Sequence, residues 1–246
     1  MEQTLSKEEM IRYDRQIILS DFEVEAQLKL KNARVLVIGV GGLGSIASLY
    51  LASAGIGYLG IVEYDSVDIS NIHRQILYTE KDIDKPKANL AKQILTEHNS
   101  LVTLVSHEEY LTNKNGMEVI SKYDIVLDAT DNIKARYLIS DSCALLKKPL
   151  VHGTAVAWDG YVTVLNYGDG PCYRCLFPET AKYEAQRAAV RVGIMGVVAG
   201  IIGQLMAQQA ILLAAQKEGI LAQRMLAFDG RKTKFTEIKL RGRSVL

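Results

Sequence analysis

Short apolar runs alternate along this chain with longer stretches in which apolar residues recur at helical spacing. In the first half, strand-like runs cover 34–38, 59–63, 101–106 and 124–129, and helical patterns cover 43–54 and 86–98. This alternation is typical of βαβ units, so we expect an α/β fold with a mainly parallel sheet.

After Pro149 the alternation gives way to shorter strand-like runs. Strands are predicted around Val151 and at 161–165, 224–228 and 234–240, and we expect them to extend the sheet as antiparallel strands. At the other end of the chain, Ser6 and Glu9 have the spacing of a capping box, which predicts a helix running toward Arg15.

The stretch 192–216 carries no formal charge and is long enough to cross a bilayer, which takes about 20 residues. Four glutamines interrupt it, and its glycines recur at spacings of three and four. Such spacing places small residues on one helix face, where another backbone can pack closely. We therefore expect a helix of the core or of a dimer interface, with no membrane span.

Composition narrows the class of protein. The chain has 246 residues, 48% of them hydrophobic, with 29 basic against 28 acidic side chains. An almost neutral chain has no general attraction for nucleic acid or anionic lipid. Three cysteines do not make a disulfide framework, and the charged N-terminus does not resemble a secretory signal. We expect a single-domain cytoplasmic protein.

A glycine-rich segment, Gly39-Val-Gly41-Gly42-Leu-Gly44, follows the predicted strand 34–38 and begins the next helix. Glycines let a phosphate approach the backbone, and a helix N-terminus offers free N–H donors. Glu63 follows about 20 positions later, where such a site expects an acidic residue for the ribose hydroxyls. The sequence therefore predicts a Rossmann-like nucleotide-binding fold.

Two classes of enzyme use such a scaffold: oxidoreductases that bind a dinucleotide, and enzymes that split ATP. The block Ser70-Asn71-Ile-His-Arg74-Gln75 and the nearby Lys87 favour the second class. Charge builds up on pyrophosphate as it leaves ATP, and arginine, lysine and magnesium are the usual counter-charges.

The predicted strand 124–129 is followed by Asp131 and Asn132, and it contains Asp128. Open α/β sheets bind ligands at the carboxyl ends of their strands. Magnesium prefers few protein oxygens and completes its shell with water and phosphate, so one carboxylate here is a natural Mg²⁺ ligand. A helix cap by Asp131 is the structural alternative.

Taken together, the motifs resemble those of the MoeB and ThiF adenylyltransferases, also called the HesA group, relatives of ubiquitin-activating enzymes. The matching blocks, in the family's order, are Arg12-Tyr-Asp-Arg15-Gln16, the glycine-rich segment, Ser70 to Gln75, Lys87, Asp128 to Asn132, and Cys172-Tyr-Arg-Cys175. They cover nearly the whole chain, and six blocks in order are a specific signal.

The resemblance implies a single adenylation domain over 1–246, with N-terminal helices in 1–30, a nucleotide-binding half in 31–150, and a half for carrier binding and dimerisation in 151–246. It implies a homodimer that binds ATP with Mg²⁺ and adenylates the Gly-Gly tail of a small ubiquitin-like carrier of the molybdopterin or thiamine thiazole sulfur pathway. Asp131 would bind Mg²⁺, and Arg15 would reach the phosphates from the partner subunit. The expected catalytic residues are Arg15, Arg74, Lys87 and Asp131, and the expected nucleotide-binding residues are Gly39, Gly41, Gly42, Gly44, Glu63, Ser70, Asn71, Arg74, Lys87, Asp131 and Asn132.

That chemistry agrees with the residues that the chain lacks. A carboxylate tail is already an anion at neutral pH, so its attack on phosphorus needs positioning and charge neutralisation but no general base. No Ser/His/Asp set and no P-loop motif is visible. We expect His98, His107 and His152 to be structural, whereas His73 lies inside a motif.

The cysteines depart from the family pattern. Many members bind zinc through two CxxC pairs, but here Cys172 and Cys175 form the only pair. Tetrahedral zinc takes four ligands, so we expect free thiols in place of a Zn²⁺ site. Some members also carry a reactive cysteine in the following loop, and 177–191 contains none. We therefore expect the reaction to stop at the acyl-adenylate, with sulfur coming from a separate persulfide donor.

Three alternatives remain open at this point. A sister class activates a modified tRNA base by adenylation, although the neutral charge disfavours a large RNA footprint. A NAD-dependent oxidoreductase would not depend on Arg74 or Asp131. A non-catalytic partner subunit usually loses the charged groups that are all present here.

Overall fold

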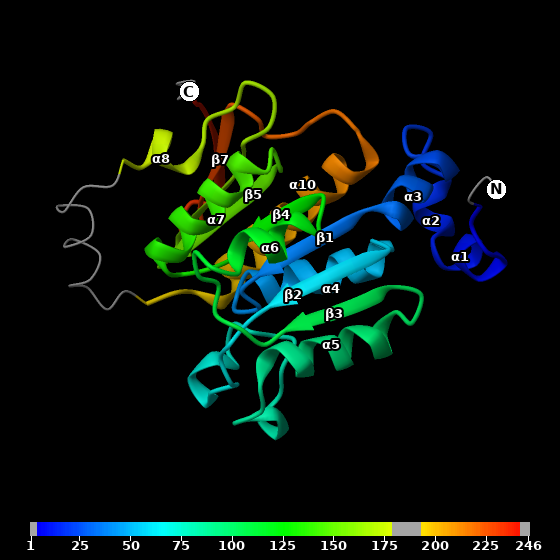
Figure 1. Ribbon diagram of the computed structural model, residues 1–246, viewed down its shortest axis with the longest axis horizontal. Coiled ribbons are helices and arrows are strands. Elements are labelled where there is room, and N and C mark those ends of the chain that lie inside the picture. Colours follow the sequence, from blue (N-terminus) through cyan, green and yellow to red (C-terminus); the bar gives the residue numbers. More distant parts are fainter. Residues whose placement is uncertain (1–3, 179–192, 242–246) are drawn as a thin grey trace.

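The computed structural model describes residues 4–178 and 193–241, which form one eight-stranded sheet with helices on both faces (Figure 1). The strands are β1 Arg34–Ile38, β2 Tyr58–Val62, β3 Thr103–His107, β4 Ile125–Asp128, β5 Leu150–Val156, β6 Asp159–Leu165, β7 Arg224–Asp229 and β8 Lys234–Lys239. The helices are α1 Lys7–Arg12, α2 Asp14–Ile17, α3 Glu23–Asn32, α4 Gly44–Ala54, α5 Lys87–His98, α6 Gly116–Ser121, α7 Ile133–Leu145, α8 Tyr173–Leu176 and α10 Gly196–Ala215, with 3₁₀ turns η1 Ile69–Asn71 and η2 Glu80–Asp82.

The sheet has the order β3-β2-β1-β4-β5-β6-β7-β8. The first five strands in this order pair in parallel, and β6, β7 and β8 continue the sheet as antiparallel strands. This arrangement confirms the predicted fold class. The topology brings the carboxyl ends of β1, β2, β4 and β5 to one edge, where open α/β sheets bind their ligands.

Both faces of the parallel strands are covered. Val35 and Val37 of β1 point into a core formed with α3, α4, α5 and α10, whereas Leu36 and Ile38 point into a second core with α6, α7 and α8. Burial on both sides explains why these strands read as continuous apolar runs instead of alternating ones.

Helix α10 is a core helix that packs against α4, β5 and β6. It is the one helix among the described residues that is long and apolar enough to cross a bilayer, and more than half of its apolar stretch is buried inside the protein. At Gly203 a Cβ atom would overlap the Ile46 side chain and the Leu43 carbonyl, so glycine permits close packing on α4. Gly200 faces open space, so the glycine stripe serves packing only in part.

The N-terminal prediction is confirmed at its start and corrected after it. Ser6 and Glu9 form the expected capping box, but the helix breaks at Tyr13 into α1 and α2. The Tyr13 ring is buried, and its hydroxyl accepts a hydrogen bond of 2.9 Å from Asn99. The resemblance placed N-terminal helices in 1–30, where α3 begins, and the suggested cap by Asp131 implied a helix at α7, whereas α6 was not predicted. In α3 only Ala26, Gln27 and Leu30 are buried, which leaves a weak apolar periodicity.

Candidate active site

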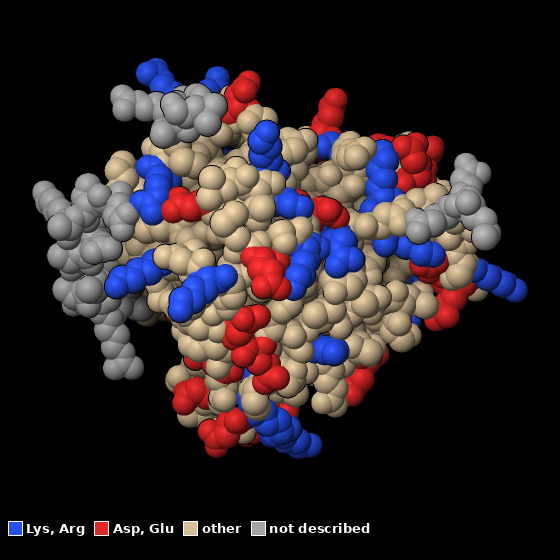
Figure 2. All heavy atoms as spheres, in the orientation of Figure 1, with Lys and Arg blue, Asp and Glu red and all other residues tan. Residues whose placement is uncertain are grey.

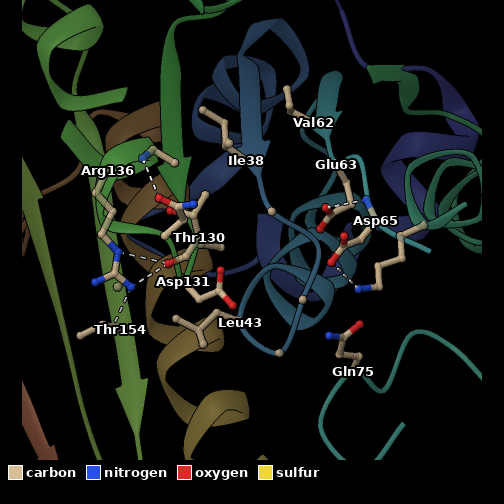
Figure 3. Close-up of a pocket in the computed structure, with 18 of the residues that line it drawn as sticks. Ile38, Leu43, Val62, Glu63, Asp65, Gln75, Thr130, Asp131, Arg136 and Thr154 are labelled. Carbon is tan, nitrogen blue, oxygen red and sulfur yellow. Dashed lines mark hydrogen bonds and ion pairs between the residues drawn. The ribbon is translucent and has the colours of Figure 1, made fainter. Parts of the chain in front are cut away.

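A cavity of about 360 Å³ opens at the carboxyl ends of β1, β2, β4 and β5 (Figure 3). Its volume lies in the range of small-molecule sites, roughly 300–1,000 Å³. The predicted residues that line it are Gly39, Gly41, Gly42, Glu63, Arg74, Lys87, Asp131 and Asn132. Segments separated by more than ninety positions in the sequence therefore converge on one space.

The glycine-rich segment forms one wall. Gly39 has a φ of +89°, which side chains rarely adopt, and a Cβ atom there would lie 3.0 Å from the Ala129 carbonyl oxygen. At Gly44 a Cβ atom would overlap the carbonyl of Gly39. The N-terminus of α4 is thereby held close to β1, with Gly41 and Gly42 facing the cavity. Free N–H groups and the helix dipole make this wall suitable for a phosphate.

Glu63 lies directly after β2 and is held by the backbone around it. Its carboxylate accepts hydrogen bonds from the N–H groups of Val40 at 3.1 Å, Tyr64 at 2.9 Å and Asp65 at 3.2 Å. These bonds fix the carboxylate at the edge of the glycine-rich wall. A carboxylate in this position can still accept from ribose hydroxyls, because each oxygen has two acceptor directions.

Lys87 brings a buried positive charge to the cavity. Its side chain is 4% exposed, and its Nζ atom lies 3.4 Å from Oδ2 of Asp65, which is 57% exposed. This long contact with a solvated carboxylate neutralises a buried ammonium only in part. Gln75 lies nearby, buried, and its Oε1 atom has no hydrogen-bond partner among the described residues. Both side chains have capacity left for a ligand.

Arg74 supplies the second cation. Its Nη1 atom donates to the Ser70 carbonyl at 2.8 Å and lies 2.9 Å from Nε2 of His73. Ser70 and Asn71 form the turn η1 and do not line the cavity themselves. Ser70 and Asn71 instead shape the turn that precedes Arg74.

The two carboxylates at the end of β4 lie in different environments. Asp128 is fully buried, whereas Asp131 is exposed and lies against the cavity (Figure 3). The cap of α7 is Asn132, whose Oδ1 atom accepts from the N–H groups of Lys134 and Ala135. The suggested cap by Asp131 was therefore wrong, and its carboxylate is left for a ligand. A single carboxylate beside a phosphate-sized space fits Mg²⁺, which takes its remaining ligands from water and phosphate.

Beneath this strand end, Asp128 forms a buried polar network. Its Oδ2 atom lies 2.9 Å from Nδ1 of His152, and its Oδ1 atom accepts from the backbone and hydroxyl of Thr130. Burial raises the pKa of Asp128, but His152, Arg136 and Thr130 outweigh it, so the pKa lies below its ordinary value. Burial lowers the pKa of Arg136, but the Asp128 carboxylate reverses this effect and the pKa is raised.

Some predicted residues lie elsewhere. Arg15 lies in α2, at the opposite end of β1 from the cavity (Figure 1). Gly44, Ser70 and Asn71 support the walls without lining them. The sulfur atoms of Cys172 and Cys175 lie 2.7 Å apart, and no group of three metal-ligating side chains occurs in the described part of the chain. The expectation that the reaction involves no cysteine of the loop 177–191 concerns residues that mostly lie outside those described.

Several residues that line the cavity were not among the expected binding residues: Tyr64, Asp65, Gln75, Tyr110, Arg136 and Thr154. Tyr64 and Asp65 follow Glu63 directly, and Gln75 is the last residue of the block that contains Arg74, so position in or beside a motif was the available signal. Arg136 lies one helical turn after Asn132 and had no local signal, because its role depends on contact with Thr130 and with Thr154 of β5.

Comparison with known proteins places the chain in a family. Residues 13–245 match the sequence profile of the ThiF family. The chain belongs to the ThiF family. Its similarity is to proteins named adenylyltransferase and sulfurtransferase MOCS3: 47% identity to that of Culex quinquefasciatus over 97% of this chain, and 46% to that of Arabidopsis thaliana over 99%. This ThiF-family chain spans about half the length of these relatives, 55% and 53%.

Solved structures share the fold of this ThiF-family chain. The E. coli MccB structure with ATP superposes with a TM-score of 0.85 at 22% identity, over 95% of this chain and 73% of MccB. The structure of PaaA also gives a TM-score of 0.85 at 22% identity, over 98% of this chain and 86% of PaaA. At this identity the likeness establishes the architecture alone.

Proposed function

We propose that this protein uses ATP to adenylate the C-terminal Gly-Gly carboxylate of a small ubiquitin-like sulfur carrier. The observation that carries the proposal is the convergence of Lys87, Arg74, the α4 N-terminus and Asp131 on one cavity. The relatives' name, adenylyltransferase and sulfurtransferase MOCS3, supports the same activity and favours a molybdopterin-type carrier over a thiazole-type one.

In the proposed reaction, a carboxylate oxygen of the carrier forms a bond to the α-phosphorus of ATP, and the bond from that phosphorus to the bridging oxygen breaks. Pyrophosphate leaves with the electron pair. Lys87 and Arg74 stabilise the charge that develops on it, and Glu63 orients the ribose. Mg²⁺ bound at Asp131 would supply further charge neutralisation on the phosphates.

The homodimer is part of the proposal, because Arg15 cannot serve the cavity of its own chain. Apolar side chains lie exposed near Arg15 and along α10: Ile18 is 60% exposed and Val197 is 65% exposed. A groove between α2 and the end of α10 is lined by Leu19, Ile211 and Leu212. These surfaces fit a second copy of the chain, which would bring its Arg15 to the phosphates.

A carrier protein is favoured over tRNA as substrate. On the face shown in Figure 2, Lys and Arg side chains are interspersed with Asp and Glu instead of gathered into one continuous basic area. A tRNA footprint requires several phosphate contacts from clustered basic residues. We further propose that the protein works in the cytosol and that the sulfur comes from a separate persulfide donor.

The test is pyrophosphate exchange into ATP with magnesium, run with purified Gly-Gly carriers, with tRNA and without substrate. We expect exchange that depends on a carrier and is abolished in Asp131→Ala. Asp124→Asn is the matched control, because Asp124 is a carboxylate at the opposite end of β4, bonded to the Arg34 backbone. Exchange with tRNA alone would move the protein to the tRNA-modifying class, and no exchange at all would contradict the proposal.

A further inference from the structure

His152 is a completely buried, ionisable side chain that the proposed reaction does not use. It lies on β5, and its Nδ1 atom is 2.9 Å from Oδ2 of Asp128, which is equally buried. Its Nε2 atom lies 3.3 Å from the hydroxyl of Tyr161 on β6. Buried ionisable pairs are costly unless all their polar atoms are satisfied, so this pair needs a structural or functional reason.

The pair continues into the loop that carries Asp131. Oδ1 of Asp128 accepts from the Thr130 backbone N–H at 3.0 Å and from its hydroxyl at 2.6 Å. The Thr130 carbonyl accepts from Nη2 of Arg136 at 2.7 Å. Thr130 is therefore held on both sides, and Asp131 is the next residue in the chain.

The network also determines which of two carboxylates faces the cavity. Asp128 and Asp131 lie near each other at the end of β4, where two free carboxylates would repel. His152 from β5 contacts Asp128 directly, and the charge of Arg136 from α7 also lowers the pKa of this buried carboxyl. Tyr161 of β6, Tyr173 of α8 and Cys143 of α7 are the other titratable groups around this pair. Of these two carboxylates, only Asp131 is left to offer its charge to the cavity.

We propose that His152 is a positioning residue: by holding Asp128, and through it Thr130, it fixes the loop that presents Asp131 to the magnesium and phosphates of ATP. The inference rests on the proposed function, since it assigns a use to the Asp131 carboxylate. It differs from a purely structural role in one respect, because the effect of losing His152 falls on magnesium-dependent binding.

The test compares His152→Ala, His152→Asn and Gln27→Ala. Asparagine can place an amide donor near the position of Nδ1 and keep the bond to Asp128, so it is the conservative variant. Gln27 is a fully buried polar residue of α3, bonded to the Ala54 carbonyl at the other end of the sheet, and it serves as the control for lost stability alone. Calorimetry measures ATP affinity with magnesium and with a chelator, and amide exchange of 129–132 is followed without ligand.

We expect His152→Ala to weaken ATP binding in magnesium by about tenfold, as for other residues that orient a metal ligand, while binding in chelator changes far less. Exchange of 129–132 should become faster in this variant. His152→Asn should recover most of both effects, and Gln27→Ala should show neither.

Equal binding losses with and without magnesium, or a His152→Ala protein that differs from Gln27→Ala in neither readout, would overturn the inference. If His152→Ala does not fold, a His152→Asn protein with native binding and exchange supports the inference, and one that loses magnesium-dependent binding contradicts it. Absence of magnesium-dependent ATP binding in the unaltered protein would overturn the proposed function and this inference together, whereas normal exchange behaviour of the variants alone would overturn only the inference.

Discussion

The Nζ atom of Lys87 lies 3.4 Å from Oδ2 of Asp65, with the ammonium buried and the carboxylate largely in solvent. A buried ammonium with one distant, solvated partner is poorly compensated. A bound phosphate would complete its neutralisation, and this relationship leads to the first prediction.

Lys87→Ala should lower the rate of adenylation by about 10²–10³-fold, as for other groups that stabilise charge in a transition state. Lys87→Arg should restore little, because a planar guanidinium does not fit a buried site shaped for a point charge. Pyrophosphate exchange measures both variants. Activity of Lys87→Ala close to that of the unaltered protein would remove Lys87 from the catalytic set.

Gly44→Ala should destabilise the protein and abolish ATP binding, since the added methyl overlaps the Gly39 carbonyl and forces the nucleotide wall apart. The expected loss is about 1–3 kcal/mol, as for other overpacked sites. Gly116→Ala is the matched control: Gly116 also begins a helix, and its Cβ atom would make only an ordinary contact of 3.7 Å with Leu138. In urea denaturation and ATP titration, Gly116→Ala should behave like the unaltered protein, whereas Gly44→Ala should be less stable and should not bind ATP.

Arg15 and Asp131 should complement each other between subunits. Arg15→Ala and Asp131→Ala dimers should each be inactive in pyrophosphate exchange. A mixed dimer has one site with an intact Asp131 and an intact Arg15 from the partner, so mixing should recover up to about half of the activity per mixed dimer. No recovery after verified subunit exchange would show that Arg15 does not act across the interface.

The buried Asp128 should make stability depend on acid pH. Its pKa is lowered in the folded state, so the carboxylate stabilises the protein fully above its ordinary pKa of about 3.9 and loses that contribution as pH falls through the folded value. Over this range the unfolding free energy should fall by up to about 1.4 kcal/mol per pH unit. The difference between the unaltered protein and Asp128→Asn in urea denaturation should shrink in acid. A difference independent of pH would contradict this assignment.

The three cysteines should differ in alkylation. Burial raises the pKa of the Cys143 thiol, and its side chain has no exposed surface. Burial also raises the pKa of Cys172, but Cys172 and Cys175 are only half-buried, so both should react with iodoacetamide at pH 8 in the folded protein. Mass spectrometry should find Cys143 modified only after unfolding. Zinc bound by the pair would instead protect both until a chelator is added.

Much of the site could be read from local sequence. The glycine-rich segment, Glu63, Arg74, Lys87 and Asp131 each lie in a short motif, and the alternation of strand and helix patterns brings such motifs to the carboxyl ends of parallel strands. The antiparallel extension by β6, β7 and β8 was also predictable, because the pattern changes after Pro149.

Contacts between distant segments could not be read in this way. His152 and Asp128 are 24 positions apart, and only the pairing of β4 with β5 sets them side by side. The same is true of Arg136 with Thr154, and of Asn132, which takes the cap of α7 and leaves Asp131 to the cavity.

The sequence by itself determined the fold class and the short motifs that line the cavity, because hydrophobic periodicity and such motifs act over a few neighbouring residues. The tertiary structure decided which side chains are neutralised inside the protein and which are left for a ligand. That choice depends on burial and on hydrogen bonds across strands and helices, and these exist only once the chain has folded.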